Sequence, residues 1–194
     1  MLRARLCAAL LLSFLKASPL KAQECPVATT YSFYSVSGVS ADEIKASMLK
    51  RGPRDDFGSV RFAYTDWSVK WKWKRLEDGS VNPDSVKLSC TANILLPELD
   101  PNTVLSPELR DGWNGFVERT RQHELNHVAH VEQMAPEIYK RLRADLQQSG
   151  RLSGKRASAI VSEVIAEIKA LDRRYDAETD HGCTEGAWRI QPTM

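Results

Sequence analysis

The fold is decided by residues 106–148, SPELRDGWNGFVERTRQHELNHVAHVEQMAPEIYKRLRADLQQ. Ser106, followed by Pro107 and Glu108, is typical of a helix start, because a hydroxyl caps the free amides and a carboxylate meets the positive end of the helix dipole. Large side chains then recur at the helical steps of three, four or seven: Trp113, Phe116, His123, His127, Val131, Met134, Ile138 and Leu142. We predict a helix from Ser106 to about residue 148, which Pro136 can kink.

A second helical stripe follows after a short turn at Gly150 to Gly154. Its apolar side chains again recur at helical spacing: Ile160, Val161, Val164, Ile168, Leu171 and Tyr175. Because the link is short, the two long helices are expected to pack antiparallel.

The first half of the chain has the two-residue period of strands. Tyr31 to Ser37 alternates in this way, and Ser40 with Glu43 forms a capping box for a helix to about Lys50.

Two further segments have the same period and are predicted to form a hairpin. From Phe62 to Leu76 the large residues on one face are Trp67, Val69, Trp71 and Trp73. Residues 86–96 repeat the pattern until Pro97, and Asp78-Gly79 supplies a turn between the two. We therefore predict an α+β fold, in which a small antiparallel sheet packs on two long antiparallel helices.

The two faces of this hairpin have different expected roles. Tryptophans at period two are more often the buried face of a sheet than a ligand platform. The lysines opposite them, Lys70, Lys72 and Lys74, indicate a solvated face. The strand Thr91 to Pro97 could hold an extended peptide by backbone hydrogen bonds if its edge is exposed.

Residues 1–22 have the layout of a secretory signal, with Arg3 and Arg5 before an apolar run from Leu6 to Leu15. That run is shorter than the about 20 residues that span a bilayer. The segment holds four basic and no acidic residues, so its removal changes the formal net charge from +2 to −2 and argues against a nucleic-acid partner. We predict a single domain over 23–194, periplasmic or secreted, with no membrane span in the mature chain.

The cysteines point to an oxidising compartment. Cys7 leaves with the signal, and Cys25, Cys90 and Cys183 remain. One disulfide and one free thiol is the simplest expectation, and the sequence leaves the pairing open.

The segment His123-Glu124-Leu125-Asn126-His127 carries the predicted chemistry. Two histidines four residues apart on a helix can both reach one zinc ion. Glu124 lies beside them, where it can contact a metal-bound water and act as a general base. A catalytic zinc needs a third protein ligand from elsewhere in the chain.

The link between the long helices indicates which segment returns to the histidine pair. A turn centred near residues 151–152 sets His123 opposite Asp180 and His127 opposite Asp176. The third ligand is therefore expected at the end of the second helix.

The segment 175–182 offers three candidate side chains. His181 is the predicted third ligand, because neutral imidazole suits zinc. Asp176 is the alternative, or it holds a ligand histidine from behind. Tyr175 is predicted to donate a hydrogen bond to an oxyanion, with a core position in the helix stripe as the alternative. His130 points round the helix, and a capping or surface role is expected for it.

These motifs carry a resemblance to a known family. The order is a tryptophan-rich strand, Ile94-Leu95-Leu96-Pro97, Trp113, His123-Glu124-Leu125-Asn126-His127 and Tyr175-Asp176-x-x-Thr179-x-His181-Gly182. It resembles a bacterial family of unknown function whose members are described as predicted secreted zinc-dependent proteases. The likeness covers most of residues 28–187 and implies a zincin-like enzyme.

Together the motif and the resemblance predict an exported zinc metallopeptidase acting on a peptide or protein. Zn²⁺ is expected on His123, His127 and His181, with Glu124 as the general base and Tyr175 as a second catalytic group. The alternatives are a zinc-dependent cell-wall amidase or hydrolase, and a non-catalytic zinc-containing periplasmic binding protein.

Overall fold

The computed structural model describes residues 24–55 and 58–190. The elements are, in order, β1 (Val27–Val36), α1 (Ala41–Arg51), β2 (Tyr64–Lys72), η1 (Pro83–Ser85), β3 (Lys87–Leu99), α2 (Pro107–Glu132), α3 (Met134–Ser149), α4 (Gly154–Thr179) and η2 (Cys183–Glu185). The mixed α+β class and the strand-rich first half are as predicted. The predicted signal at 1–22 lies outside the described residues.

The sheet has three strands in the order β1-β3-β2. The predicted hairpin is confirmed, because β2 pairs antiparallel with β3 and sets Trp67 opposite Ala92. The prediction that the whole sheet is antiparallel is wrong. β1 pairs parallel with β3 and sets Tyr31 beside Ile94, so the sheet is mixed. Between β1 and β3 the chain passes through α1 and β2, so no tight turn forces those two strands to run in opposite directions.

The central position of β3 corrects a second expectation. Thr91 to Pro97 is paired on both sides, so its backbone has no free edge for a peptide. Within the described part of the chain, β2 has its outer edge unpaired, because its only ladder is the one with β3.

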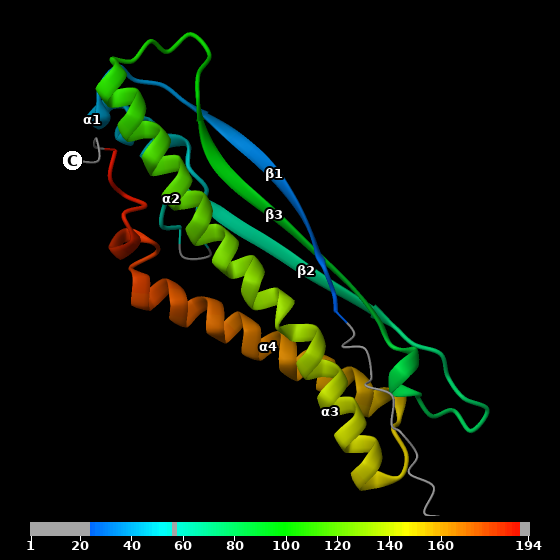
Figure 1. Ribbon diagram of the computed structural model, residues 1–194. Coiled ribbons are helices and arrows are strands. Elements are labelled where there is room, and N and C mark those ends of the chain that lie inside the picture. Colours follow the sequence, from blue (N-terminus) through cyan, green and yellow to red (C-terminus); the bar gives the residue numbers. More distant parts are fainter. Residues whose placement is uncertain (1–23, 56–57, 191–194) are drawn as a thin grey trace, which may run out of the picture.

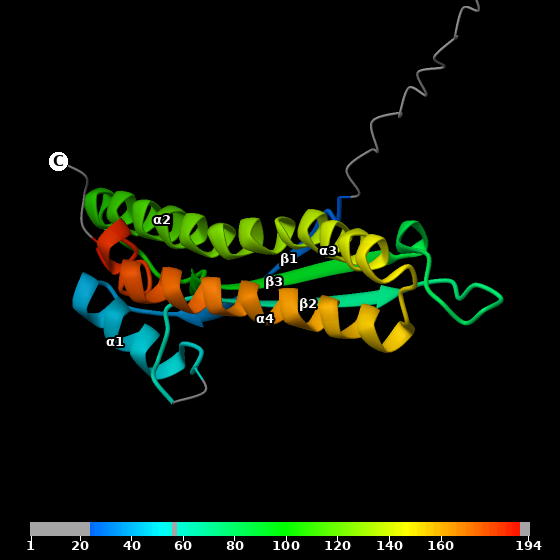
Figure 2. The same cartoon turned by 90° about the horizontal axis from the view of Figure 1, so that it is seen from below.

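The predicted first long helix is divided at Gln133 into α2 and α3. Pro136 lies in the first turn of α3 and has no N–H to donate to the carbonyl of Glu132, where its ring would also clash. The interruption is therefore centred three residues before the proline. α3 ends at Ser149 and is capped by Gly150, which has a φ of 72°. α4 then runs back beside α2 and α3 as predicted (Figures 1 and 2).

The largest core lies between the sheet and the helices. Val131, Ile138, Leu142, Ile160 and Val164 are buried in it, and the predicted inner face of β2 packs against them with Trp67, Val69 and Trp71. The tryptophans are thus partly buried against the core, which favours the interpretation of them as packing residues of the sheet. Near α1 a smaller cluster joins Ile44 and Met48 to Trp113 and Phe116 of α2.

The cysteines behave as predicted. Cys25 and Cys90 form a disulfide, and Cys183 is a free thiol. None of the helices in the described ranges is long and apolar enough to cross a membrane.

Candidate metal centre

His123 and His127 lie on the buried face of α2, with 4% and 7% of their surface exposed. The Nε2 atoms of both rings face one carboxylate oxygen: Oδ1 of Asp176 on α4 lies 3.3 Å from His123 Nε2 and 3.1 Å from His127 Nε2. Ligand atoms at about 2.0–2.1 Å from a tetrahedral zinc stand about 3.3 Å apart. The three side chains therefore have the spacing of ligands on one metal ion and could hold one.

The far side of each imidazole is also held by a carboxylate. Nδ1 of His123 lies 2.8 Å from Oε2 of Glu185, in the turn η2. Nδ1 of His127 lies 3.1 Å from Oδ1 of Asp172, one helical turn before Asp176 on α4. Metal-binding histidines typically donate their second N–H to a carboxylate, which fixes the ring and its tautomer. Both rings therefore present Nε2 to the position between them.

Asp172 accepts hydrogen bonds from three side chains on two elements, α2 and β2. Besides His127, it accepts one of 2.8 Å from Nδ1 of His130 and one of 2.8 Å from the indole Nε1 of Trp67 on β2. His127, His130 and Asp172 lie close enough to form a second candidate metal group. Their contacts are already those of donors around one carboxylate, so we interpret Asp172 as the residue that ties α2, α4 and the sheet together behind His127.

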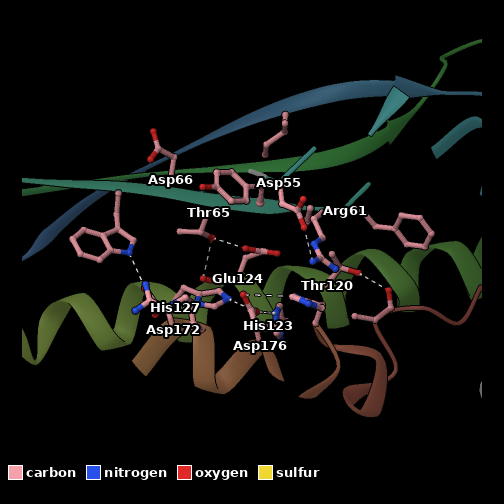
Figure 3. A pocket seen from close by; sticks show the side chains of 18 of the residues that line it. Asp55, Arg61, Thr65, Asp66, Thr120, His123, Glu124, His127, Asp172 and Asp176 are labelled. Atoms are coloured by element: carbon pink, nitrogen blue, oxygen red, sulfur yellow. Dashed lines mark hydrogen bonds and ion pairs between the residues drawn. The ribbon is translucent and has the colours of Figure 1, made fainter. Parts of the chain in front are cut away.

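Glu124 lies on the cleft side of the histidine pair and is only 5% exposed. The hydroxyl of Thr65 on β2 donates a hydrogen bond of 2.7 Å to its Oε2 atom (Figure 3). Glu124 and Thr65 both line a cleft of about 840 Å³. Its lining includes Thr65, Trp67, Thr120, His123, Glu124, His127, Lys169, Asp172, Arg173, Asp176 and His181. Glu124 is therefore placed to act on a molecule or water in the cleft.

The negative charge of the site is reflected in its pKa values. Burial lowers the pKa of His127, but hydrogen bonds to Asp172 and Asp176 outweigh this effect and raise it to about 10. Burial raises the pKa of Asp176, and the hydrogen bonds from the two histidines reverse the shift and lower it. The pKa of Glu124 is raised, chiefly by burial. The carboxylates around the two histidines thus favour a positive charge between them. Either protons on the histidines or a divalent cation can supply that charge.

His181 lies next to this group. Its Nδ1 atom is 3.7 Å from Oδ2 of Asp176, the oxygen turned away from the histidine pair, and the ring lines the cleft. The structure thus brings Asp176, the alternative from the sequence, between the two histidines. The assignment of His181 as a ligand stays a prediction.

Tyr175 supports the site by packing its ring against both histidines. Its ring stacks on His123 with the centroids 4.9 Å apart, and its hydroxyl bonds to Glu185 at 2.9 Å and accepts a hydrogen bond of 2.6 Å from Asn126. Burial raises its pKa to about 12. The residue is not part of the cleft lining. We therefore assign Tyr175 a positioning role, and its bond to an oxyanion stays a prediction.

The turn after α4 brings Glu185 to the ring of His123. Thr179 accepts a hydrogen bond from the N–H of Gly182 and donates one of 2.8 Å to the carbonyl of Tyr175. Gly182 has a φ of +81°, and a Cβ atom there would lie 3.0 Å from Cγ of His123. The threonine and glycine of the closing motif therefore let the chain turn tightly against His123 and deliver Glu185.

The predicted pairing of the two helices is confirmed for His127, which lies beside Asp176, and is wrong by one helical turn for His123. His123 faces Asp176 rather than Asp180, and His127 faces Asp172 as well as Asp176. The break at Gln133 and the crossing of α2 by α4 shift the pairing from that of two straight helices. Sequence reasoning therefore missed Asp172, and it missed Thr65 and Glu185 because they come from other segments. The step of four between Asp172 and Asp176, matching His123 and His127, was the available signal.

Comparisons with known proteins define a family. No curated protein and no solved structure matches the chain significantly. A family model described as "bacterial protein of unknown function (DUF922)" matches residues 31–182, which include most of the sheet, the histidine pair and the returning helix α4. The chain belongs to this bacterial family of unknown function, DUF922.

Proposed function

We propose that the protein is a zinc-dependent metallopeptidase, with zinc held by His123, His127 and Asp176. The observation that carries the proposal is the common approach of two Nε2 atoms and one carboxylate oxygen, at 3.1–3.3 Å, at the floor of a cleft that also contains Glu124. Two histidines and one carboxylate leave a zinc ion one position for water. Asp176 replaces His181 in this assignment.

Glu124 is the proposed general base. When bound, zinc lowers the pKa of water and polarises a carbonyl oxygen. Glu124 takes the proton from the attacking water and returns it to the leaving amine. Burial raises its pKa, which brings the carboxyl closer to the pH at which it must both accept and release a proton. Thr65 holds the carboxylate by its 2.7 Å hydrogen bond, so the base has a fixed position.

The free edge of β2 supports a peptide as the substrate. Tyr64, Thr65 and Trp67 line the cleft, and in the described structure no other strand pairs with the outer side of β2. An extended peptide can add to such an edge through backbone hydrogen bonds, which bind a chain of any sequence. This role was expected of the Thr91 to Pro97 strand, and it passes to β2 because β3 is central.

A setting outside the cytoplasm is part of the proposal. The disulfide between Cys25 and Cys90 is compatible with an oxidising compartment, where such bonds persist. Periplasmic and secreted proteins meet that condition.

Zinc content and peptide hydrolysis test the proposal together. The wild-type protein is expected to bind zinc and to digest a denatured protein mixture, with loss of activity on chelation and recovery on adding zinc. Glu124→Gln should retain zinc and lose hydrolysis, because the amide cannot accept the proton. Glu132→Gln, at an exposed position on the same helix α2, is the matched control and should keep both.

Three outcomes have distinct meanings. Retained hydrolysis in Glu124→Gln would remove the base from its role. Cleavage of purified muropeptides alone would favour a cell-wall amidase. Zinc binding with no hydrolysis of either material would favour a binding protein.

A further inference from the structure

Two basic side chains flank the proposed metal site on α4. Lys169 and Arg173 both line the cleft, and both are exposed. They are four residues apart, so they form one row along the helix. Asp172 and Asp176, also four apart, form the neighbouring row that faces the histidines. The basic row therefore runs beside the metal-facing row, on the same wall of the cleft.

Trp67 links Lys169 to the site. Its ring lies 5.8 Å from Nζ of Lys169, and its indole N–H holds Asp172. The lysine head is thus placed over an aromatic wall shared with the metal centre, rather than far out in solvent.

The acidic groups of the cleft are already engaged by other partners. Asp172 and Asp176 bond to the histidines, and Glu124 bonds to Thr65. Within the described ranges neither Lys169 nor Arg173 has an ion-pair partner. Their positive charges are therefore available to a ligand.

The cleft lining has four other charged residues, Arg54, Asp55, Arg61 and Asp66. Asp66 alternates with Thr65 and Trp67 along β2, so it points to the opposite face of the strand, as Figure 3 shows. Arg61 is paired with Asp55 at 2.6 Å. Arg54 donates a hydrogen bond of 2.8 Å to the carbonyl of Gly58. The basic group next to the metal-facing carboxylates is thus the cationic row on α4.

We propose that Lys169 and Arg173 select peptide substrates that carry a carboxylate close to the bond being cut. The carboxylate belongs either to an Asp or Glu side chain or to the C-terminus of the peptide, since both present the same group to a lysine and an arginine. The inference rests on the proposed peptidase function and adds the substrate class to it.

Cleavage-site profiling of the zinc-loaded full chain tests the inference. Digests of a denatured protein mixture are expected to show Asp and Glu enriched at one position near the cut, or cuts concentrated near free C-termini. Matched synthetic peptides then separate the two sources, with Glu exchanged for Gln in one pair and a free C-terminus exchanged for an amide in the other. The favoured acidic peptide should have a kcat/KM about fivefold higher than its neutral partner, the equivalent of one exposed ion pair.

Two variants and a control assign the preference to the basic row. The double variant Lys169→Gln with Arg173→Gln should lose the preference through a higher KM for the acidic peptide, with kcat retained. The reversed pair, Lys169→Glu with Arg173→Glu, should favour Lys or Arg at the same position. Arg174→Gln is the control, because Arg174 is exposed on the same helix turn and is not part of the cleft lining.

The outcomes separate this inference from the function on which it rests. Hydrolysis with no acidic preference, or a preference unchanged in both double variants, would overturn the inference and leave the peptidase intact. Absence of any hydrolysis by the zinc-loaded wild type would overturn the peptidase, and the inference with it.

Discussion

The Nδ1 atom of His127 lies 3.1 Å from Oδ1 of Asp172, on the side of the imidazole opposite Asp176. Asp172 thereby fixes which ring nitrogen faces the site. Because outer carboxylates of this kind typically change metal affinity by about 10–100-fold, Asp172→Asn is expected to weaken zinc binding by that factor. The fold should remain, since the amide keeps the shape of the side chain.

Competition with a fluorescent zinc chelator measures the effect of Asp172→Asn. Glu167→Gln is the control, because Glu167 lies on the same helix and pairs with Arg141, away from the site. Equal zinc affinities in the two variants would show that Asp172 does not support the metal ligand.

Position 182 requires glycine, because its backbone lies against the ring of His123. Gly182→Ala imposes a left-handed conformation on a residue with a Cβ, which costs about 1–2 kcal/mol. It also forces Cβ to within 3.0 Å of the His123 ring. Both the stability of the fold and the affinity for zinc should therefore fall.

A matched glycine separates these two effects. Gly150 has a φ of +72°, and a Cβ there would meet nothing within 4 Å. Gly150→Ala should lower the free energy of unfolding by a similar conformational cost and leave zinc affinity unchanged. An equal loss of zinc affinity in both variants would contradict the role of the His123 contact.

The disulfide should be a large part of the stability of the fold. Cys25 and Cys90 are 65 residues apart in sequence, and a cross-link across such a loop is expected to contribute about 4 kcal/mol by restricting the unfolded chain. Replacing both with alanine should lower the free energy of unfolding accordingly in urea titrations. Cys183→Ala should have little effect. A double variant as stable as the wild type would show that the bridge adds nothing.

The zinc-free protein should lose stability as the pH rises above neutrality. Folding raises the pKa of His127 from 6.5 to about 10 through its bonds to Asp172 and Asp176. This contribution is fully present below pH 6.5 and disappears as the pH rises through about 10. The Tm of the zinc-free protein should therefore fall between pH 7 and pH 9, because the stabilisation from protonated His127 is lost over this range.

Zinc should show the opposite trend over the same range. The metal requires neutral histidines, so its affinity and the Tm increase that it causes should grow as the pH rises. Thermal melts with and without zinc across this range measure both trends. A zinc-free Tm that does not depend on pH would show that the carboxylates do not hold a proton on His127.

The sequence predicted the main elements because their signals are local. The period of residues 106–148, the cap at Ser40 and the alternation around Trp67 each depend on neighbours a few residues away. The parallel pairing of β1 with β3 depends on contacts 63 residues apart, such as Tyr31 with Ile94, and no local pattern encodes it.

The candidate site was also predictable only where its signals are local. The spacing of His123 and His127 gave the pair, and the antiparallel helices gave the region of the third ligand. The choice between Asp176 and His181 depends on one helical turn of offset and on the left-handed residues Asp180 and His181, where the helix ends. Such offsets arise from the packing of whole helices, so they were not readable from the sequence.

The identity of the third ligand tests the central claim most directly. Zinc stoichiometry by elemental analysis, after dialysis against a weak chelator, should be measured for the wild type, Asp176→Ala and His181→Ala. The account predicts that the wild type and His181→Ala each retain one zinc ion per chain and that Asp176→Ala loses it. Zinc retained in Asp176→Ala and lost in His181→Ala would contradict the account, as would a wild-type protein that binds no zinc.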